Sequence, residues 1–423
     1  MTLLAPAAPG LDLAAIRAQF PALAVQQDGQ PVVYLDNPAG TQVPRRMMDA
    51  ITAYLETSNA NVHGPFLTSA RTDALVATAR QGMADFLNAP SPQEIIFGAN
   101  MTQLTYTLSR AIGRDFGPGD EVLVTELDHD ANVTPWTDLA ERGVTVKRVP
   151  VRLDDCTLDM EALAGLLSPR TRLVAVTHAS NAVGTVPAVA AIAQLVHAAG
   201  ALLWVDAVHY GPHGPLDVQA LGADYLVCSA YKFFGPHVGI AWGRADLLAA
   251  LRPYKVRPAA DTVPDRFENG TKNHECLAGL VGTLAYLADL GRHAAAADLA
   301  PQAALQAAMT AVRRHETGLS RALLTGLATV PGLRIYGISD PARLAERVPT
   351  VAFTLDGHDT TAVGRALAAA GIFAWTGNYY ALEIMQRLGL EGHGGAVRIG
   401  AVHYNTPAEI TRLVETLHRI VKT

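Results

Sequence analysis

Short apolar runs alternate with helix-like segments through the middle of the chain. The runs that are predicted to be buried strands are 94–97, 121–125, 172–177, 202–206, 224–228 and 239–242. Helical patterns lie between them, as at 132–142 and 189–199. This alternation predicts an α/β fold with a mostly parallel sheet flanked by helices, and an active site beyond the carboxyl ends of the strands.

The pattern changes toward the C-terminus. Residues 294–327 are rich in Ala and Leu with little Gly or Pro, which predicts a long helix that links the sheet domain to a smaller domain. In that smaller α+β domain, we expect a strand over 348–354 and helices over 359–370 and 407–421. The predicted division is an N-terminal segment 1–30 that packs with the small domain, a large domain 31–290, and the linking helix with the small domain over 291–423.

Composition and charge restrict the possible functions. Hydrophobic residues make up 49% of the 423 positions and charged residues 17%, so we expect a globular protein with a large buried core. The formal net charge is −6 and no basic stripe interleaved with aromatic residues occurs, which argues against nucleic acid or an anionic membrane as a partner. No run of about 18 apolar residues suggests a membrane span, and the first residues lack the basic start of a signal peptide.

The three cysteines are Cys156, Cys228 and Cys276. They are too few and too scattered for a disulfide framework or a zinc site. We therefore expect a reducing, cytoplasmic setting.

The most informative pair of residues is Lys232 and Asp206, because each stands at or just after the end of an apolar, strand-like run. A lysine behind small and aromatic neighbours loses its proton more easily than a solvated one, and a neutral amine can form a Schiff base with an aldehyde. An aspartate at the end of a neighbouring strand can hold a pyridinium nitrogen protonated. Together the two residues indicate pyridoxal 5'-phosphate (PLP), a cofactor that acts as an electron sink.

Further motifs support this interpretation. They are YLDNPAGTQVP at 34–44, NVHG at 61–64, NMTQ at 100–103, TELDHDAN at 125–132, HASNAVGT at 178–185, DAVH at 206–209, SAYK at 229–232, ENGT at 268–271 and VRIGAVHYNT at 397–406. With them the chain resembles the class V aminotransferase family of PLP enzymes (fold type I), and within it the cysteine desulfurase branch. The resemblance implies an amino acid substrate and a homodimer whose subunits share their active sites.

For the cofactor's phosphate, the resemblance implies a site at the start of a helix. Met101 and Thr102 open that helix, and backbone amides at a helix N-terminus bind phosphate through unpaired N–H groups and the helix dipole. Ser229 would add a hydroxyl from the strand before the lysine. Thr271 would reach the phosphate of the other subunit.

For the cofactor's ring, the resemblance implies five contacts. His129 would stack on the pyridine ring, and Asn181 and His209 would lie near its phenolic oxygen. Asp206 would hold the pyridinium nitrogen, and Lys232 would be the Schiff-base lysine and the base that removes the α-proton. Lys232, His129 and Asp206 are therefore the expected catalytic residues.

For the substrate, the resemblance implies that Arg398 holds the carboxylate through two parallel hydrogen bonds. Asn37 would lie at the site entrance, and His63 would come from the partner's segment. The wall would be formed by Trp375 and Tyr380. The desulfurases carry an arginine at the first of these two positions and the sulfur-accepting cysteine at the second, and a persulfide needs a thiolate that tyrosine cannot supply.

Other positions also depart from the family pattern. Gly64 stands for an arginine, Asn100 for a glycine, His209 for a glutamine and Tyr231 for a histidine. A metal site from Asp206, His209 and His213 is an alternative use of these side chains. Pro212 disfavours a regular helix across that spacing, so we expect no metal.

We therefore expect a desulfurase-like PLP enzyme that acts on an amino acid, by C–S cleavage or a related β-elimination without a persulfide cysteine. Several alternatives stay open. The enzyme could be an aminotransferase or an epimerase, or a desulfurase that uses a non-standard cysteine such as Cys276. A PLP-binding protein without turnover is the alternative from another class.

Overall fold

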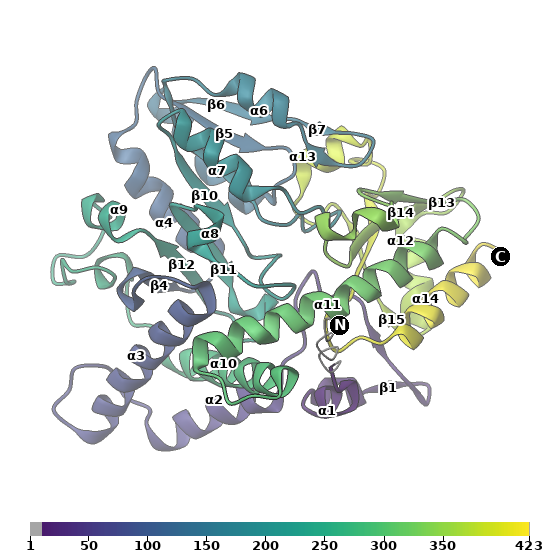
Figure 1. Ribbon diagram of the computed structural model, residues 1–423, viewed down its shortest axis with the longest axis horizontal. Helices are drawn as coiled ribbons and strands as arrows, with labels where there is room; N and C mark the ends of the chain where they lie inside the picture. The colour runs from purple at the N-terminus through teal and green to yellow at the C-terminus, as the bar shows by residue number, and fades with distance from the viewer. Residues whose placement is uncertain (1–10, 423) are drawn as a thin grey trace, which may run out of the picture.

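A seven-stranded sheet forms the middle of the large domain in the computed structural model, which describes residues 11–422 (Figure 1). The strand order is β4-β12-β11-β10-β9-β5-β6. The strands are β4 Ile95–Gly98, β5 Glu121–Thr125, β6 Thr145–Val149, β9 Thr171–Thr177, β10 Leu202–Asp206, β11 Tyr225–Ser229 and β12 Gly239–Gly243. Each predicted strand is confirmed to within one residue at either end, whereas β6 was not predicted.

The sheet is mostly parallel, as predicted, and it is buried on both faces. Strand β12 runs antiparallel to β11 and to β4, and the other neighbours pair in parallel. In β9, Val174 and Val176 belong to one hydrophobic cluster, and Leu173 and Ala175 belong to another. Successive side chains of a strand point to opposite faces, so this run of apolar residues fills both layers of the core.

Helices cover the sheet on both sides (Figure 1). The helices of the large domain are α2 Arg45–Thr57, α3 Leu67–Leu87, α4 Met101–Ile112, α5 Thr134–Thr137, α6 Met160–Leu166, α7 Val189–Ala198, α8 Val218–Leu221, α9 Ala245–Ala250 and α10 His274–Ala295. The prediction of a helix over 189–199 is confirmed by α7. The prediction over 132–142 is confirmed in part, because that stretch is helical but consists of the four-residue α5 between two 3₁₀ helices.

The connection between the domains consists of two helices rather than one. Helix α10 ends before Ala296, whose φ of 51° lies in the left-handed region, and α11 spans Pro301–Leu327. Proline is favoured in the first turn of a helix but not inside it, so the predicted single helix over 294–327 is wrong at its start. The N-terminal half of α11 packs in the large-domain core through Ala304, and its C-terminal half packs in the small-domain core through Leu327.

The small domain is an antiparallel sheet covered by helices, which agrees with the α+β class expected for it. Its strand order is β13-β14-β17-β16. The elements are β13 Leu333–Tyr336, β14 Thr350–Leu355, α12 Thr360–Ala369, β16 Trp375–Gly377, α13 Leu382–Arg387, β17 Ala396–Gly400 and α14 Pro407–Ile420. The strand predicted over 348–354 and the helices predicted over 359–370 and 407–421 correspond to β14, α12 and α14.

The N-terminal segment is described from residue 11 onward, and residues 1–10 of the predicted segment 1–30 lie outside the described part. Helix α1, Leu13–Ala18, contacts the small domain through Arg17, whose Nη1 lies 2.9 Å from Glu409 Oε1 of α14. Phe20 packs edge-on against Tyr286 of α10, with ring centroids 5.4 Å apart. The segment therefore bridges both domains, and the boundaries proposed at residues 30 and 290 stay predictions.

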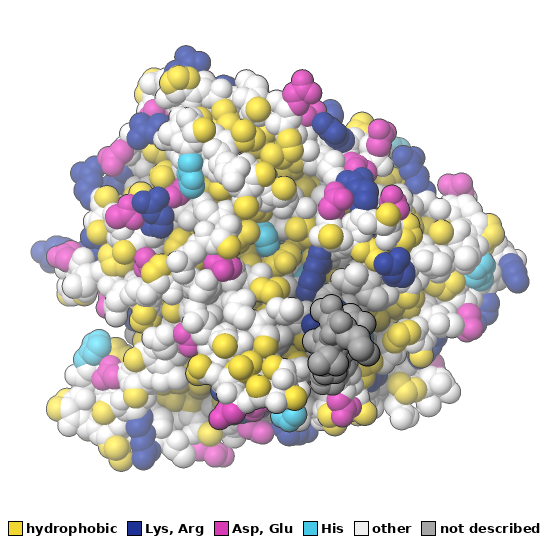
Figure 2. All heavy atoms as spheres, in the orientation of Figure 1, with side chains coloured by type: hydrophobic (Ala, Val, Ile, Leu, Met, Phe, Trp, Pro, Cys, Tyr) yellow, Lys and Arg dark blue, Asp and Glu magenta, His cyan; other side chains and the backbone are white. Residues whose placement is uncertain are grey.

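Charged side chains of both signs are interspersed among apolar ones on the face that Figure 2 shows. Within residues 11–422, no helix is long and apolar enough to cross a membrane.

Candidate active site

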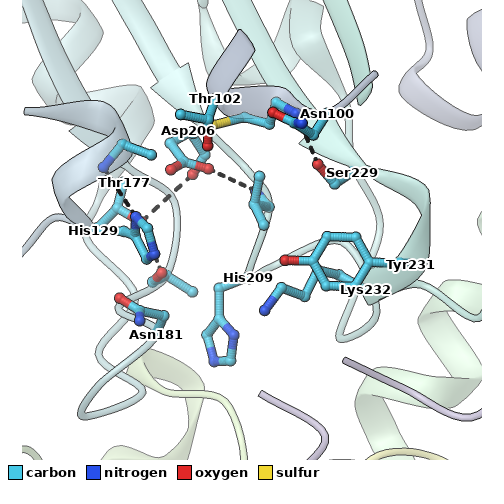
Figure 3. Close-up of a pocket in the computed structure, with 14 residues that line it drawn as sticks. Asn100, Thr102, His129, Thr177, Asn181, Asp206, His209, Ser229, Tyr231 and Lys232 are labelled. Carbon is cyan, nitrogen blue, oxygen red and sulfur yellow. Dashed lines mark hydrogen bonds between the residues drawn. The ribbon is translucent and has the colours of Figure 1, made fainter. Parts of the chain in front are cut away.

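A cavity opens where the carboxyl ends of β9, β10 and β11 meet the N-terminus of α4 (Figure 3). Thr177, Asp206 and Ser229 are the last residues of these three strands, and Thr102 lies in the first turn of the helix. Because parallel strands end at the same edge of a sheet, side chains far apart in the sequence converge there. Eight of the nine predicted cofactor residues line the cavity: Met101, Thr102, His129, Asn181, Asp206, His209, Ser229 and Lys232.

Lys232 lies in the 3₁₀ turn that follows β11, and only 8% of it is exposed. Its Nζ donates hydrogen bonds to the carbonyl oxygens of Pro38 and Ala39, the second at 3.1 Å. Burial and the nearby Arg398 lower the pKa of the amine to about 7, against the opposing effect of Asp206. A substantial fraction of the amine is therefore neutral near pH 7, which a nucleophile or a base requires.

Asp206 is the buried acidic partner in the same cavity. Its Oδ1 accepts a hydrogen bond from the backbone N–H of Val208 at 2.8 Å. Burial raises the pKa of the carboxyl to about 7, although that hydrogen bond and Lys232 favour the charged form. A carboxylate that is buried without a full cationic partner fits a positively charged group such as a pyridinium.

The N-terminus of α4 forms the other end of the cavity. Asn100 caps the helix, since its Oδ1 accepts from the backbone N–H of Gln103 at 2.9 Å. The N–H of Met101 donates to Ser229 Oγ at 3.1 Å, so this hydroxyl lies beside the positive end of the helix dipole. The arrangement fits a phosphate group held by backbone amides and by the hydroxyls of Ser229 and Thr102.

His129 and Asn181 form the side wall. His129 Nδ1 accepts from the N–H of Ala131 at 3.0 Å, so the neutral ring carries its proton on Nε2. Burial, with Lys232 and then Arg398 nearby, lowers the pKa of this imidazole to about 4. Asn181 Oδ1 is buried and has no hydrogen-bond partner within the described residues, so it can accept a hydrogen bond from a ligand.

His209 lines the cavity, but its Nε2 lies 2.9 Å from Thr350 Oγ1 of β14. Behind it, His213 Nδ1 lies 2.7 Å from Oε2 of Glu316, a residue of α11 that is fully buried. No group of three metal ligands occurs among residues 11–422. Glu316 could not be predicted as a partner of His213, because no local sequence pattern connects α11 to a residue 103 positions away.

A second cavity, called the outer cavity, shares Lys232 with the first, or inner, cavity. Arg398 lines the outer cavity only. Nη1 of Arg398 donates to the carbonyl oxygen of Asn181 at 2.9 Å, and its guanidinium lies 4.2 Å from the ring centroid of Tyr379. Burial lowers the pKa of Arg398 to about 10, so it stays charged at neutral pH. Its Nε is buried without a partner within the described part of the chain, which fits a site for a carboxylate.

The outer wall of this second cavity is aromatic and exposed. Trp375 is 52% exposed and Tyr380 is 74% exposed. The ring of Tyr380 stacks on His129 with centroids 5.6 Å apart and an interplanar angle of 18°. Tyr379 and Tyr380 both have left-handed φ angles, of 58° and 57°, which the sequence did not predict.

Three predicted site residues lie outside both cavities. Asn37 is buried, and its Nδ2 donates to the carbonyl oxygens of Tyr34 at 2.9 Å and Gly400 at 2.8 Å, so it braces the neighbouring backbone. The imidazole of His63 is 85% exposed and its Nδ1 lies 3.1 Å from Asp73. Thr271 lines a separate surface cavity.

None of the chain's three cysteines lines either cavity. Cys228 is buried within β11, and burial raises the pKa of its thiol well above the usual range. Cys156 is buried as well, with a pKa raised to about 11. Cys276 is half-buried near the start of α10, and burial also raises its pKa.

Comparison with known proteins places the chain among PLP enzymes. The family model for aminotransferase class-V matches residues 33–413. Cysteine desulfurase from Pectobacterium atrosepticum is 35% identical over 422 residues, which cover 96% of this chain and 97% of that protein. Probable cysteine desulfurase from Streptomyces coelicolor is 34% identical over 432 residues, covering 97% of this chain and 98% of that protein.

Solved structures agree with this result. The apo structure of cysteine desulfurase from Thermococcus onnurineus has a TM-score of 0.86 at 26% identity, and covers 98% of this chain and 99% of its own. The cysteine desulfurase CsdA from Escherichia coli has a TM-score of 0.82 at 27% identity, with coverage of 98% and 99%. The predicted α/β fold of PLP enzymes is thereby confirmed.

Proposed function

The chain belongs to the class V aminotransferase family and is a PLP-dependent enzyme of the cysteine desulfurase type, and we propose that it cleaves the C–S bond of an amino acid by β-elimination without an enzyme persulfide. The observation that carries this proposal is Tyr380. By the resemblance to the desulfurases, it stands where they have their sulfur-accepting cysteine, and no cysteine lines either cavity. A persulfide needs a thiolate within reach of the substrate's sulfur, and this site offers none.

The residues in the inner cavity fit PLP, and their proposed roles follow from its chemical groups. The N-terminus of α4 with Thr102 and Ser229 would hold the phosphate, and Asp206 would hold the pyridinium nitrogen. The unpartnered Oδ1 of Asn181 would contact the phenolic oxygen. When bound, PLP supplies an electron sink that makes the α-hydrogen of an amino acid acidic.

The protein's own residues would then orient the substrate and move its protons. Arg398 would bind the α-carboxylate through paired N–H groups that are already desolvated. Lys232 faces the same cavity, and its lowered pKa leaves an amine that can take up the α-proton at Nζ near neutral pH. His129, neutral and held by Ala131, keeps its ring orientation without adding a second positive charge.

Departure of the β-sulfur with its bonding electrons completes a β-elimination. For an S-substituted cysteine, proton uptake and addition of water give a thiol, pyruvate and ammonia as the balanced products. In a desulfurase-type reaction, an enzyme thiolate would attack the sulfur instead. With Tyr380 at the position of that thiolate, the sulfur is released as part of the thiol product.

We also propose that the enzyme is a homodimer with shared sites, in a cytoplasmic setting. The resemblance implies that His63 and Thr271 both reach an active site. Within one chain neither lines the cavities that contain Lys232, which supports a dimer in which they reach the partner's site. Light scattering of the purified holoenzyme checks this point, and a monomer would contradict it.

A product screen by mass spectrometry tests the proposed reaction. The holoenzyme is incubated with cysteine, S-substituted cysteines and common amino donors. We expect a thiol and pyruvate from an S-substituted cysteine, and no sulfur bound to the protein. A protein persulfide formed from cysteine would overturn the proposal, and a product that keeps its side chain would identify an aminotransferase or an epimerase instead.

A further inference from the structure

We propose that Trp375 and Tyr380 form an aromatic subsite that selects amino acids whose side chain ends in an aromatic group. The proposal rests on the proposed function for the chemistry of the site. It concerns binding, which can be measured without turnover.

The strand register places Trp375 beside the carboxylate-binding residue. Trp375 of β16 is the direct partner of Arg398 of β17 in an antiparallel pair. Residues directly opposite each other in such a pair project to the same face of the sheet. Both side chains also line the outer cavity, so a ligand whose carboxylate binds Arg398 lies next to the indole.

The position of Lys232 sets the direction of the ligand. Lys232 lines both cavities, whereas residues 375–380 line only the outer one and form its outer wall. An amino acid that presents its carboxylate to Arg398 and its α-carbon to Lys232 therefore extends its side chain toward that wall. The structure assigns this wall, rather than the inner cavity, to the recognition of the side chain.

Tyr380 is held in place although its side chain is exposed. Its backbone N–H donates to Asn378 Oδ1 at 3.1 Å, and its carbonyl oxygen accepts from the N–H of Asp130 at 2.7 Å. Its ring stacks on His129. A ring that is fixed before the ligand arrives loses little conformational entropy on binding, which is what a preformed recognition surface requires.

Residues 375–380 of the wall carry no charged side chain. Trp375 and Tyr380 present two flat aromatic rings to the outer cavity. Aromatic pairs attract each other beyond the area they bury. We expect a preference of about 10-fold or more for an aromatic over a methyl terminus.

The four tryptophans supply a direct readout of binding. Trp136 and Trp204 are 0% exposed and Trp242 is 3% exposed, whereas Trp375 is 52% exposed. Quenching of the holoenzyme's fluorescence by iodide therefore reports mainly on Trp375. S-benzyl-L-cysteine and L-phenylalanine should protect it from iodide at lower concentrations than S-methyl-L-cysteine and L-alanine, and Trp375→Phe should remove most of the quenchable signal.

Variants test which residues make the subsite. Dissociation constants are measured from changes in the absorbance of the bound cofactor on titration with L-phenylalanine, which has a benzyl side chain, and L-alanine, which has a methyl side chain, because neither carries a leaving group for β-elimination. Trp375→Ala and Tyr380→Ala should each reduce the preference for the benzyl ligand several-fold, and together they should abolish it. The matched control is Tyr254→Ala, because Tyr254 is 56% exposed and lies outside both cavities.

Two results would overturn the proposal. One is equal affinity of the wild-type holoenzyme for the benzyl and methyl ligands, and the other is an unchanged preference in the double variant. These outcomes are independent of the reaction. Selective binding without release of a thiol would support the aromatic subsite and contradict β-elimination. Release of a thiol without selective binding would support β-elimination and contradict the subsite.

Discussion

The inner cavity and the outer wall of the site are built in different ways. Asp206 and Lys232 lie at buried ends of the central sheet, where burial moves both pKa values to about 7. Trp375 and Tyr380 lie on a three-residue strand and a left-handed turn, and more than half of each is exposed. Under the proposed function, the inner cavity would activate the α-carbon, and the outer wall would select the amino acid by its side chain.

This difference has a consequence for mutations. In the inner cavity, one side chain affects protonation, packing and cofactor binding together, because burial strengthens every electrostatic interaction there. On the exposed wall, a substitution can alter the substrate without altering the fold.

The largest effect is expected at Lys232. Lys232→Ala removes the only amine among residues 11–422 that lines either cavity, so we expect turnover to fall by at least about 10³-fold. Borohydride treatment followed by mass spectrometry should show no cofactor attached to the variant. Lys255→Ala is the matched control, and covalent cofactor on another lysine of Lys232→Ala would refute the assignment.

A large loss of stability is expected behind the cavity, at the buried pair of His213 and Glu316. Both side chains are at most 2% exposed, and His213→Ala leaves the carboxylate without its partner. Removing one partner of a buried pair costs about 3–5 kcal/mol. Urea unfolding of the cofactor-free protein measures this loss.

Two further variants separate the charge effect from simple packing. Adding Glu316→Gln to His213→Ala should recover part of the lost stability, because the buried charge is removed. His197→Ala serves as a matched control, since His197 is 43% exposed and pairs with Asp224, which also binds Arg244. We expect a loss below about 1 kcal/mol there, and equal losses for the two histidines would contradict the burial argument.

The convergence of the inner-cavity residues could be predicted from the sequence, because the information for it is local. The ends of β10 and β11 follow from apolar runs that stop at Asp206 and Ser229, and parallel topology brings such ends together. The same reasoning could not find Glu316, whose contact with His213 spans 103 positions. Contacts across domains depend on how α11 packs, which no local pattern encodes.

Backbone geometry explains the other errors. The break between α10 and α11 depends on Ala296, which adopts a left-handed φ without a glycine to signal it. The same holds for Tyr379 and Tyr380 in the outer wall. Asn37, which a motif places at the site entrance, lies outside both cavities and bonds the backbone of Tyr34 and Gly400, so its role at the site stays a prediction.

At Asp206, a substitution is expected to raise the stability of the folded protein, whereas His213→Ala lowers it. Its folded pKa of about 7 lies above the ordinary value of about 3.9, so the folded state retains a proton that the unfolded state releases. The favourable contribution of this carboxyl is complete below about pH 4 and is lost as the pH rises through about 7. Asp206→Asn should therefore stabilise the cofactor-free protein by about 1–3 kcal/mol at pH 8 while abolishing turnover.

Urea unfolding of both cofactor-free proteins at pH 8 and pH 5 measures this difference. The gain should shrink toward pH 5, because Asp206 is then protonated and resembles the amide. An Asp206→Asn variant that is less stable at pH 8 would show that the carboxylate is well paired even without the cofactor.

The smallest effect on stability is expected on the outer wall. Tyr380→Ala keeps the left-handed backbone that the tyrosine already tolerates, so it adds no new strain, and it loses mainly a ring that is 74% exposed. We expect the free energy of unfolding of the holoenzyme to change by less than about 1 kcal/mol. Urea unfolding measures this change. A loss of stability as large as that of His213→Ala would mean that the stacking of Tyr380 on His129 supports the inner cavity. The inner cavity and the outer wall would then not be separable.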